Sequence, residues 1–100
     1  MPEGDPPRSR RLRLVAVPNP SAGSVQIWLD LVGPTSVRAV VVDAEGRMVR
    51  RLEDVDVPAG RVAILWDGRD DRGHAMPCGS YWVRVRTEEG ERALRLTLIR

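Results

Sequence analysis

Apolar and polar residues alternate with a period of two along most of this chain. The clearest run is residues 25–31, where valine, isoleucine and two leucines alternate with glutamine, tryptophan and aspartate. Because successive side chains on a strand point to opposite faces, this pattern predicts a strand with one buried face. A period of 3.6 residues, which would predict a helix, holds over no segment of about 11 residues.

Seven segments are predicted to be strands on this basis: residues 12–16, 25–31, 37–43, 48–55, 61–66, 81–86 and 94–98. Turn-forming residues separate them at intervals of about ten, which is the spacing expected for an antiparallel sandwich. Residues 37–43 are apolar on both faces, so this strand is predicted to be central or covered on its outer side. The prediction is an all-β, antiparallel β-sandwich.

Residues 66–81 join two of these strands through a dense set of turn-forming residues. Gly68, Gly73 and Gly79 can take positive φ without steric cost, and the carboxylate of Asp67 can accept a nearby backbone N–H. Trp66 and Tyr81 are predicted to anchor the two ends in apolar surroundings, each with one polar atom that needs a partner. The segment is therefore interpreted as a structural corner.

Charge gives little support for a nucleic-acid function. The chain has 100 residues, 16 basic residues that are all arginine, 14 acidic residues and a net charge of +2. A dedicated nucleic-acid binder would carry a clear excess of cations on one face. The one basic cluster is Arg8, Arg10, Arg11 and Arg13, for which a solvated arm is predicted, with phosphate or membrane-surface binding as the alternative.

The division into domains follows from the same composition. Residues 1–11 are rich in proline and arginine and are predicted to be a disordered leader, followed by one sandwich domain over residues 12–100. The leader has no apolar core, so no signal peptide is predicted, and no apolar run approaches the length of a transmembrane helix. Neither membrane insertion nor nucleic-acid binding is expected.

The spacing of the acidic residues, the histidine and the cysteine does not match a metal-binding or catalytic motif. Asp67, Asp70 and Asp71 do not match a calcium loop, because Arg72 stands where that loop requires glycine, and turn capping is predicted instead. His74 and Cys78 are too few for a tetrahedral metal site, and no triad order is present. We therefore expect no catalytic residue, no metal and no cofactor, while the single cysteine leaves the redox compartment open.

The three tryptophans are the most informative side chains. Alternation predicts that Trp66 points into the core, whereas Trp28 and Trp82 point outward. Trp82 is predicted to share an outer face with Val40 and Val42, and together these would form an apolar patch of the kind that marks an interface. The alternative is that Arg38 or Arg84 stacks on the Trp82 ring and covers it.

Four motifs in a specific order carry a family resemblance: Pro18-Asn19-Pro20, Val42-Asp43-x-x-Gly46-Arg47-x-Val49-x-x-Leu52, Gly60 followed by Trp66-Asp67-Gly68-Arg69-Asp70-x-x-Gly73, and Pro77-x-Gly79-x-Tyr81. Together they resemble the FlgD-type Ig-like domain of flagellar hook-capping proteins, over residues 16–100. The resemblance implies a small Ig-like (fibronectin-III-like) sandwich without catalytic residues. The chain departs from that family at Val42, where an aromatic is usual, and at Cys78, where a small hydroxyl residue is usual.

The function expected from this resemblance is that of a structural or protein-interaction module. Closely related modules close the C-terminus of large secreted bacterial proteins, so an accessory domain of an extracellular or cell-surface protein is expected, with a protein partner and an open oligomeric state. The sequence also resembles the C-terminal sorting domain of the type IX secretion route, although it has no lysine for the usual tail. A third possibility is a carbohydrate-binding module that stacks a sugar on Trp28 or Trp82.

Overall fold

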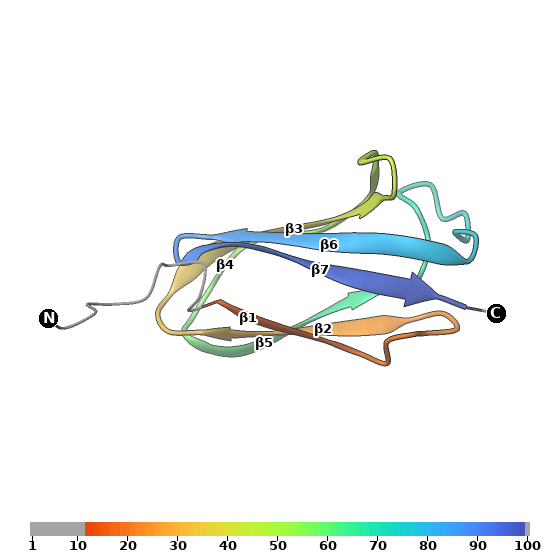
Figure 1. Cartoon of the computed structure of the whole chain (residues 1–100). Helices are drawn as coiled ribbons and strands as arrows, with labels where there is room; N and C mark the ends of the chain where they lie inside the picture. The colour runs from red at the N-terminus through yellow and green to blue at the C-terminus, as the bar shows by residue number, and fades with distance from the viewer. Residues whose placement is uncertain (1–11, 100) are drawn as a thin grey trace, which may run out of the picture.

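The computed structural model describes residues 12–99, which form seven strands in two facing antiparallel sheets (Figure 1). The strands are β1 (Arg13–Val17), β2 (Val25–Leu31), β3 (Thr35–Asp43), β4 (Met48–Val57), β5 (Gly60–Trp66), β6 (Gly79–Thr87) and β7 (Gly90–Leu98). The predicted all-β sandwich of seven strands is confirmed. The predicted leader, residues 1–11, lies outside the described residues. No helix within residues 12–99 is long and apolar enough to cross a membrane.

The strands divide unequally between the two layers. One sheet has three strands in the order β1-β2-β5, and the other has four in the order β4-β3-β6-β7. At the sides of the sandwich β1 contacts β7, and β4 contacts β5. Residues 37–43 were predicted to be central or covered on their outer side, and the central position is confirmed, since β3 lies between β4 and β6.

Several strands are longer than the apolar pattern alone predicts. β6 begins at Gly79 and β7 at Gly90, and the two strands pair without interruption from Gly79 opposite Leu98 to Thr87 opposite Gly90. Backbone hydrogen bonds continue along a ladder regardless of side-chain polarity, so cross-strand pairing extends these strands into glycine and charged residues. The ends of a strand are therefore set by its partner more than by its own composition.

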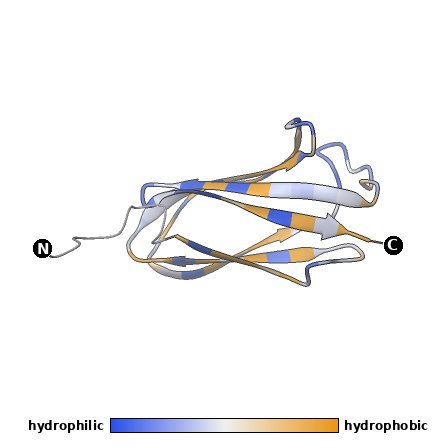
Figure 2. Ribbon diagram, viewed as in Figure 1, coloured by the Kyte–Doolittle hydropathy of each residue, from blue (hydrophilic) through white to orange (hydrophobic). Residues whose placement is uncertain are grey.

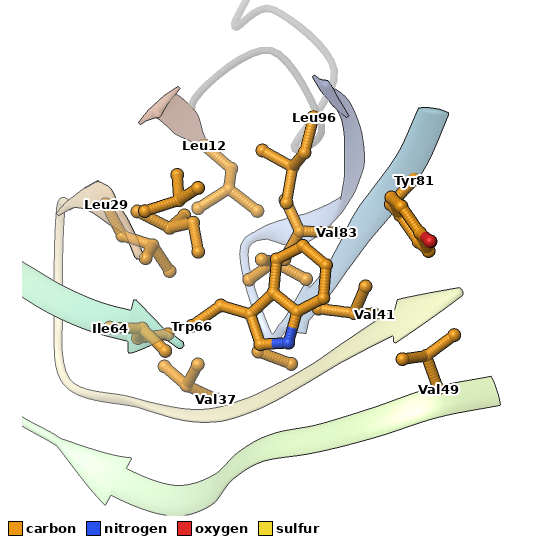
Figure 3. Close-up of a cluster of buried hydrophobic side chains, with 14 of the residues drawn as sticks. Leu12, Leu29, Val37, Val41, Val49, Ile64, Trp66, Tyr81, Val83 and Leu96 are labelled. Carbon is orange, nitrogen blue, oxygen red and sulfur yellow. The ribbon is translucent and has the colours of Figure 1, made fainter. Parts of the chain in front are cut away.

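The core is filled from the inner faces of both sheets. Buried side chains include Ile27, Ile64, Val83 and Leu96, and in Figure 2 apolar and polar residues alternate along the strands that supply them. Trp66, at the end of β5, is 0% exposed, and Figure 3 shows its indole at the centre of the buried cluster. Its ring centroid lies 5.3 Å from that of Tyr81 on the opposite sheet, so this aromatic pair joins the two layers.

β4 is the irregular strand. Its pairing with β3 shifts between Ala39 and Val40 and again between Val41 and Val42. Val55 lies opposite the buried Val37, which places it on the inner face, and yet it is 44% exposed. β4 is the edge strand of the four-stranded sheet, and the facing sheet has one strand fewer, so the inner face of β4 is less completely covered than that of β3.

The other side of the sandwich is closed by the segment that follows β1. The backbone N–H of Thr97 donates a hydrogen bond to Oδ1 of Asn19 at 3.0 Å. Nδ2 of the same side chain donates a hydrogen bond to the Arg95 carbonyl at 2.8 Å. Two further backbone bonds join Ser21 to the end of β7: its N–H donates to the Thr97 carbonyl, and its carbonyl accepts the N–H of Ile99. These residues act as a short strap along the edge of β7.

Replacement of Trp66 by alanine tests the core assignment. We expect Trp66→Ala to lower the free energy of unfolding by about 3 to 5 kcal/mol, because it leaves a large cavity between the sheets. Urea denaturation followed by circular dichroism measures this loss. The neighbouring Leu65 is 59% exposed and serves as the control, since Leu65→Ala should change the free energy by less than about 1 kcal/mol. Equal losses for the two variants would contradict the placement of Trp66.

Candidate functional site

The corner between β5 and β6 satisfies the polar atoms of both of its aromatic anchors. The indole N–H of Trp66 donates to the Arg69 carbonyl at 2.9 Å, and the Tyr81 hydroxyl donates to the Pro77 carbonyl at 2.6 Å. Both rings can therefore lie in the core without an unpaired polar group. The corner is thereby held to the interior at both ends.

The corner glycines occupy conformations that other residues rarely adopt. Gly68, Gly73 and Gly79 have φ values of 76°, 86° and 149°. At Gly68 a Cβ would also lie 3.1 Å from the carbonyl oxygen of Gly23, in the loop before β2. Backbone conformation and close approach together explain why glycine is required at this position.

The aspartates of the corner accept backbone N–H groups. Asp67 Oδ1 accepts from Arg69, Asp70 Oδ1 accepts from both Arg72 and His74, and Asp71 Oδ1 accepts from Arg51 on β4. The carboxylates thus order the turn and tie it to the edge of β4. Within residues 12–99 no group of three histidine, cysteine or acidic side chains is placed to hold a metal ion.

Two carboxylates in turns have lowered pKa values. The hydrogen bond from the His74 backbone is the main cause at Asp70, and the Arg72 backbone adds to it, so the pKa of Asp70 lies below its ordinary value. At Asp43, desolvation acts to raise the pKa, but hydrogen bonds from Arg47 and Glu45 outweigh it and the pKa is lowered. Hydrogen bonds to the charged form stabilise it in both cases.

The outer face of the four-stranded sheet carries the predicted Trp82 patch. Val42 lies directly opposite Trp82 on β6 and opposite Met48 on β4, while Val40 lies opposite Arg84. Ala93 on β7 lies opposite Arg84 and extends the apolar surface. The structure therefore brings Val40, Val42 and Trp82 together, and we call these three residues with Met48 and Ala93 the Trp82 patch.

The patch is partly hollowed. Val42 is only 7% exposed, and Trp82 is half-buried beside it. Val42, Trp82, Arg84 and Ala93 contribute to a hollow of about 270 Å³. A second hollow of about 500 Å³ lies next to it over β3 and β4, lined in part by Val40 and Met48. The patch is thus a shallow surface and not an enclosed cavity.

Arginines surround the patch. Across the sheet, Arg95 lies opposite Trp82, Arg84 opposite Val40, and Arg51 opposite Val40 from the other side. Further along the strands, Arg38 forms an ion pair with Asp54 at 3.9 Å. Arg86 forms an ion pair with Glu91 at 2.9 Å. The charge nearest the patch is therefore positive, while the more distant arginines are neutralised by acids.

Trp28 lies on the opposite side of the molecule, on the outer face of the three-stranded sheet. It stands between Val15 on β1 and Ala63 on β5, and the guanidinium of Arg61 lies 6.0 Å from its ring centroid. Arg61 also donates to Asp30 at 3.0 Å. Within residues 12–99 arginine stacking is found at Trp28, whereas the sequence suggested it for Trp82 through Arg38 or Arg84.

The sequence analysis did not identify the apolar neighbours of Trp28. Val15, Val17 and Leu65 are each at least half exposed, and the strand register places them on the same outer face. The sequence does contain a sign of this surface: Val15 and Val17 alternate with Leu14 and Ala16, so both faces of this strand are apolar. Alternation alone does not tell which of two apolar faces is the inner one.

The model of the family described as the FlgD Ig-like domain matches residues 18–91. The chain belongs to the FlgD Ig-like domain family. It is also 37% identical over 54 residues to the basal-body rod modification protein FlgD of Salmonella typhimurium, and the same protein of Salmonella typhi matches equally. That match covers 54% of this chain and 23% of the relative, so the chain spans less than a quarter of the relative's length.

Solved structures agree on the FlgD-type fold. The crystal structure of FlgD from Xanthomonas campestris superposes with a TM-score of 0.58 at 27% identity, and covers 84% of this chain and 60% of that one. Dimeric latent PorU of Porphyromonas gingivalis has a TM-score of 0.71 at 20% identity, over 88% of this chain and 9% of PorU. PorZ of the same species has a TM-score of 0.62 at 21% identity, over 98% of this chain and 13% of PorZ. The two Porphyromonas proteins support the fold alone.

Acid titration tests the role of Asp70 in the corner of this FlgD-type sandwich. A carboxylate whose pKa is lower in the folded state stabilises the fold above its unfolded pKa of about 4, and loses this effect as the pH falls through the lowered value. Asp70→Asn should therefore be less stable than the native chain near pH 7, and the difference should shrink below about pH 4. Urea denaturation over this pH range measures the difference.

The control is Asp56→Asn on β4, because the Asp56 carboxylate makes no hydrogen bond or ion pair within the described residues. This variant should match the native chain across the same range. A constant gap for Asp70→Asn at every pH would show that its carboxylate charge contributes nothing.

Proposed function

We propose that this FlgD-type Ig-like sandwich is a non-catalytic module that binds a protein partner through the Trp82 patch. The observation that supports it is the direct pairing of Val42 with Trp82 on an outer sheet face. An outer face of a sheet is normally polar, and an apolar group with a half-buried tryptophan at its centre is typical of an interface. The rigid corner and core hold this surface in place.

The charges around the patch favour an acidic partner. Arg51, Arg84 and Arg95 lie beside the apolar centre. Two acids of the sheet are paired with more distant arginines, Asp54 with Arg38 and Glu91 with Arg86. A partner surface with an apolar centre and a carboxylate rim would complement this arrangement. We infer that binding is strongest at low ionic strength, since the charged rim is exposed to solvent.

We further propose that the module serves as part of an extracellular or cell-surface assembly. The Salmonella relative is a basal-body rod modification protein, and the Xanthomonas structure is described in terms of hook capping essential for flagellar assembly. In these proteins the domain occupies only part of a longer chain. By analogy with these two proteins, we propose that the module has an accessory role beside other domains or partners.

A second candidate is a sorting domain of the type IX secretion route. The supporting observation is that PorZ, described as a surface component of the type IX secretion system, superposes over nearly the whole of this chain. A reporter fused to this chain and expressed in a host with that route should appear at the cell surface. Retention of the reporter inside the cell would contradict the sorting role and leave the binding role untouched.

Replacement of Trp82 tests the binding role. In the organism that makes the protein, chemical cross-linking and mass spectrometry should identify a partner with a carboxylate-rich contact surface. We expect Trp82→Ser to weaken that association by on the order of tenfold or more, because a central tryptophan contributes strongly to interfaces. The melting temperature should change little, since the side chain lies outside the core.

Trp28→Ser is the matched control, because Trp28 is also half-buried but lies on the opposite outer face. This variant should retain the partner. Equal loss of association in both variants, or a large fall in melting temperature for Trp82→Ser, would contradict the assignment of the Trp82 patch.

A further inference from the structure

The face of the β1-β2-β5 sheet that points away from the other layer is regular (Figure 1). The pairing of β2 with β1 and with β5 has no register shift, so the outward side chains form straight rows across the three strands. We name these the charged row, the tryptophan row and the glutamine row, and together the Trp28 face. Their members are, in that order, Arg13, Asp30 and Arg61; Val15, Trp28 and Ala63; and Val17, Gln26 and Leu65.

Two adjacent rows of the Trp28 face carry no charge. Val15, Val17 and Leu65 are each at least half exposed, and Gln26 is the one polar member of the two rows. On the other sheet, by contrast, each row of the Trp82 patch contains an arginine. A flat and largely apolar surface is complemented by another surface of the same kind.

Two polar side chains of this face have hydrogen-bonding capacity to spare. Among the residues that the structure describes, the Gln26 side chain makes no hydrogen bond, and Asp30 accepts only through Oδ1, from Arg61 at 3.0 Å. Oδ2 of Asp30 is thus open to a further donor, and Gln26 offers an amide N–H₂. The two residues lie on β2, one on each side of Trp28. An identical surface turned end to end would bring the donor to the acceptor.

From this arrangement we propose that the Trp28 face is the interface of a two-fold symmetric dimer of this chain. An axis along the strands would place each row over the same row of the second copy, with Asp30 over the partner's Asp30 and Arg13 over the partner's Arg61. An axis across the strands through Trp28 reverses the rows, so that the charged row lies over the glutamine row. Only the second arrangement keeps like charges apart.

The crossed axis makes the Trp28 face complementary to itself. Trp28 packs against the partner's Trp28 at the axis. Oδ2 of Asp30 lies opposite the partner's Gln26, which can donate to it, and the symmetry forms this bond twice. The aliphatic part of Arg61 lies over the partner's Leu65, while its guanidinium remains bonded to Asp30. Apolar, polar and charged groups of the face are thus all matched.

The size of the face sets the strength of the dimer. Three strands spaced about 4.8 Å apart, each with three outward residues, give a face of about 15 by 20 Å. Two such faces bury on the order of 1,000 Å² in total, which is near the lower limit for a specific interface. We therefore expect association only at micromolar or higher concentrations. The Trp82 patch lies on the other sheet and stays accessible, so this dimer does not depend on the function proposed for that patch.

Sedimentation equilibrium of the whole chain tests the proposal. Reducing conditions keep the exposed Cys78 from cross-linking two copies. The mass should rise from 11.2 kDa toward twice that value as the concentration is raised to about 1 mM. Trp28→Ser should weaken the dimer by at least about tenfold, because it removes the centre of the interface. The matched variant Trp82→Ser, on the opposite outer face, should dimerise like the native chain.

Two variants of one residue test the direction of the axis. Leu65 is exposed, so Leu65→Glu and Leu65→Arg should both fold, which circular dichroism verifies. Both lose the same apolar contact, but the crossed axis places residue 65 over the partner's Arg61. Leu65→Glu should therefore dimerise at least about fivefold more tightly than Leu65→Arg, and the difference should vanish in about 1 M salt.

Several outcomes would overturn the proposal. A native chain that stays monomeric at about 1 mM would leave the Trp28 face to another kind of partner. Loss of the dimer in Trp82→Ser but not in Trp28→Ser would place the interface on the other sheet. Equal dimerisation of the two Leu65 variants would reject the crossed axis, and masses above that of a dimer would indicate a head-to-tail contact. Slower amide exchange in β5 on association would indicate edge pairing, since β5 has no strand on its other side.

Discussion

The burial of Trp66 between the sheets is the interaction on which the rest of the structure depends. The ring lies at the end of β5 in the centre of the core, and its N–H needs an acceptor there. The Arg69 carbonyl supplies one, which forces the chain to turn immediately after the strand. Burial of Trp66 in the core therefore depends on the conformation of the corner. The contact between Trp66 and Tyr81 links both to the opposite sheet.

The features that support the proposed function lie on the outside of the molecule. The ladder between β3 and β6 places Val42 beside Trp82, and arginines from three strands gather around them. On the opposite face, Trp28 is partly covered by Arg61. The edges differ as much as the faces, since hydrogen bonds from loops protect β4 and β7 while β5 is left open. The unequal strand number of the two sheets is the common cause of the open edge and of the exposed Val55.

Much of the fold follows from local pattern. Alternation located seven strands, and the glycines and aspartates of residues 66–81 predicted a corner in which Trp66 and Tyr81 need polar partners. The grouping of Val40, Val42 and Trp82 required one further assumption, that β3 and β6 are neighbours. The register shifts of β4, the exposed apolar group of Val15, Val17 and Leu65, and the strap at Asn19 were not predicted, because each depends on contacts between residues far apart in the chain.

The sequence by itself determined which residues alternate, where the chain turns and which family the domain belongs to, because these depend on side-chain period, backbone freedom and local motifs. Only the tertiary structure decided which of two apolar faces is buried and which strand edge remains open. The physical reason is that burial and edge pairing are properties of two layers packed together. β3 lies inside the four-stranded sheet and β4 lies at its edge, so a valine of the inner face is covered at Val37 and exposed at Val55.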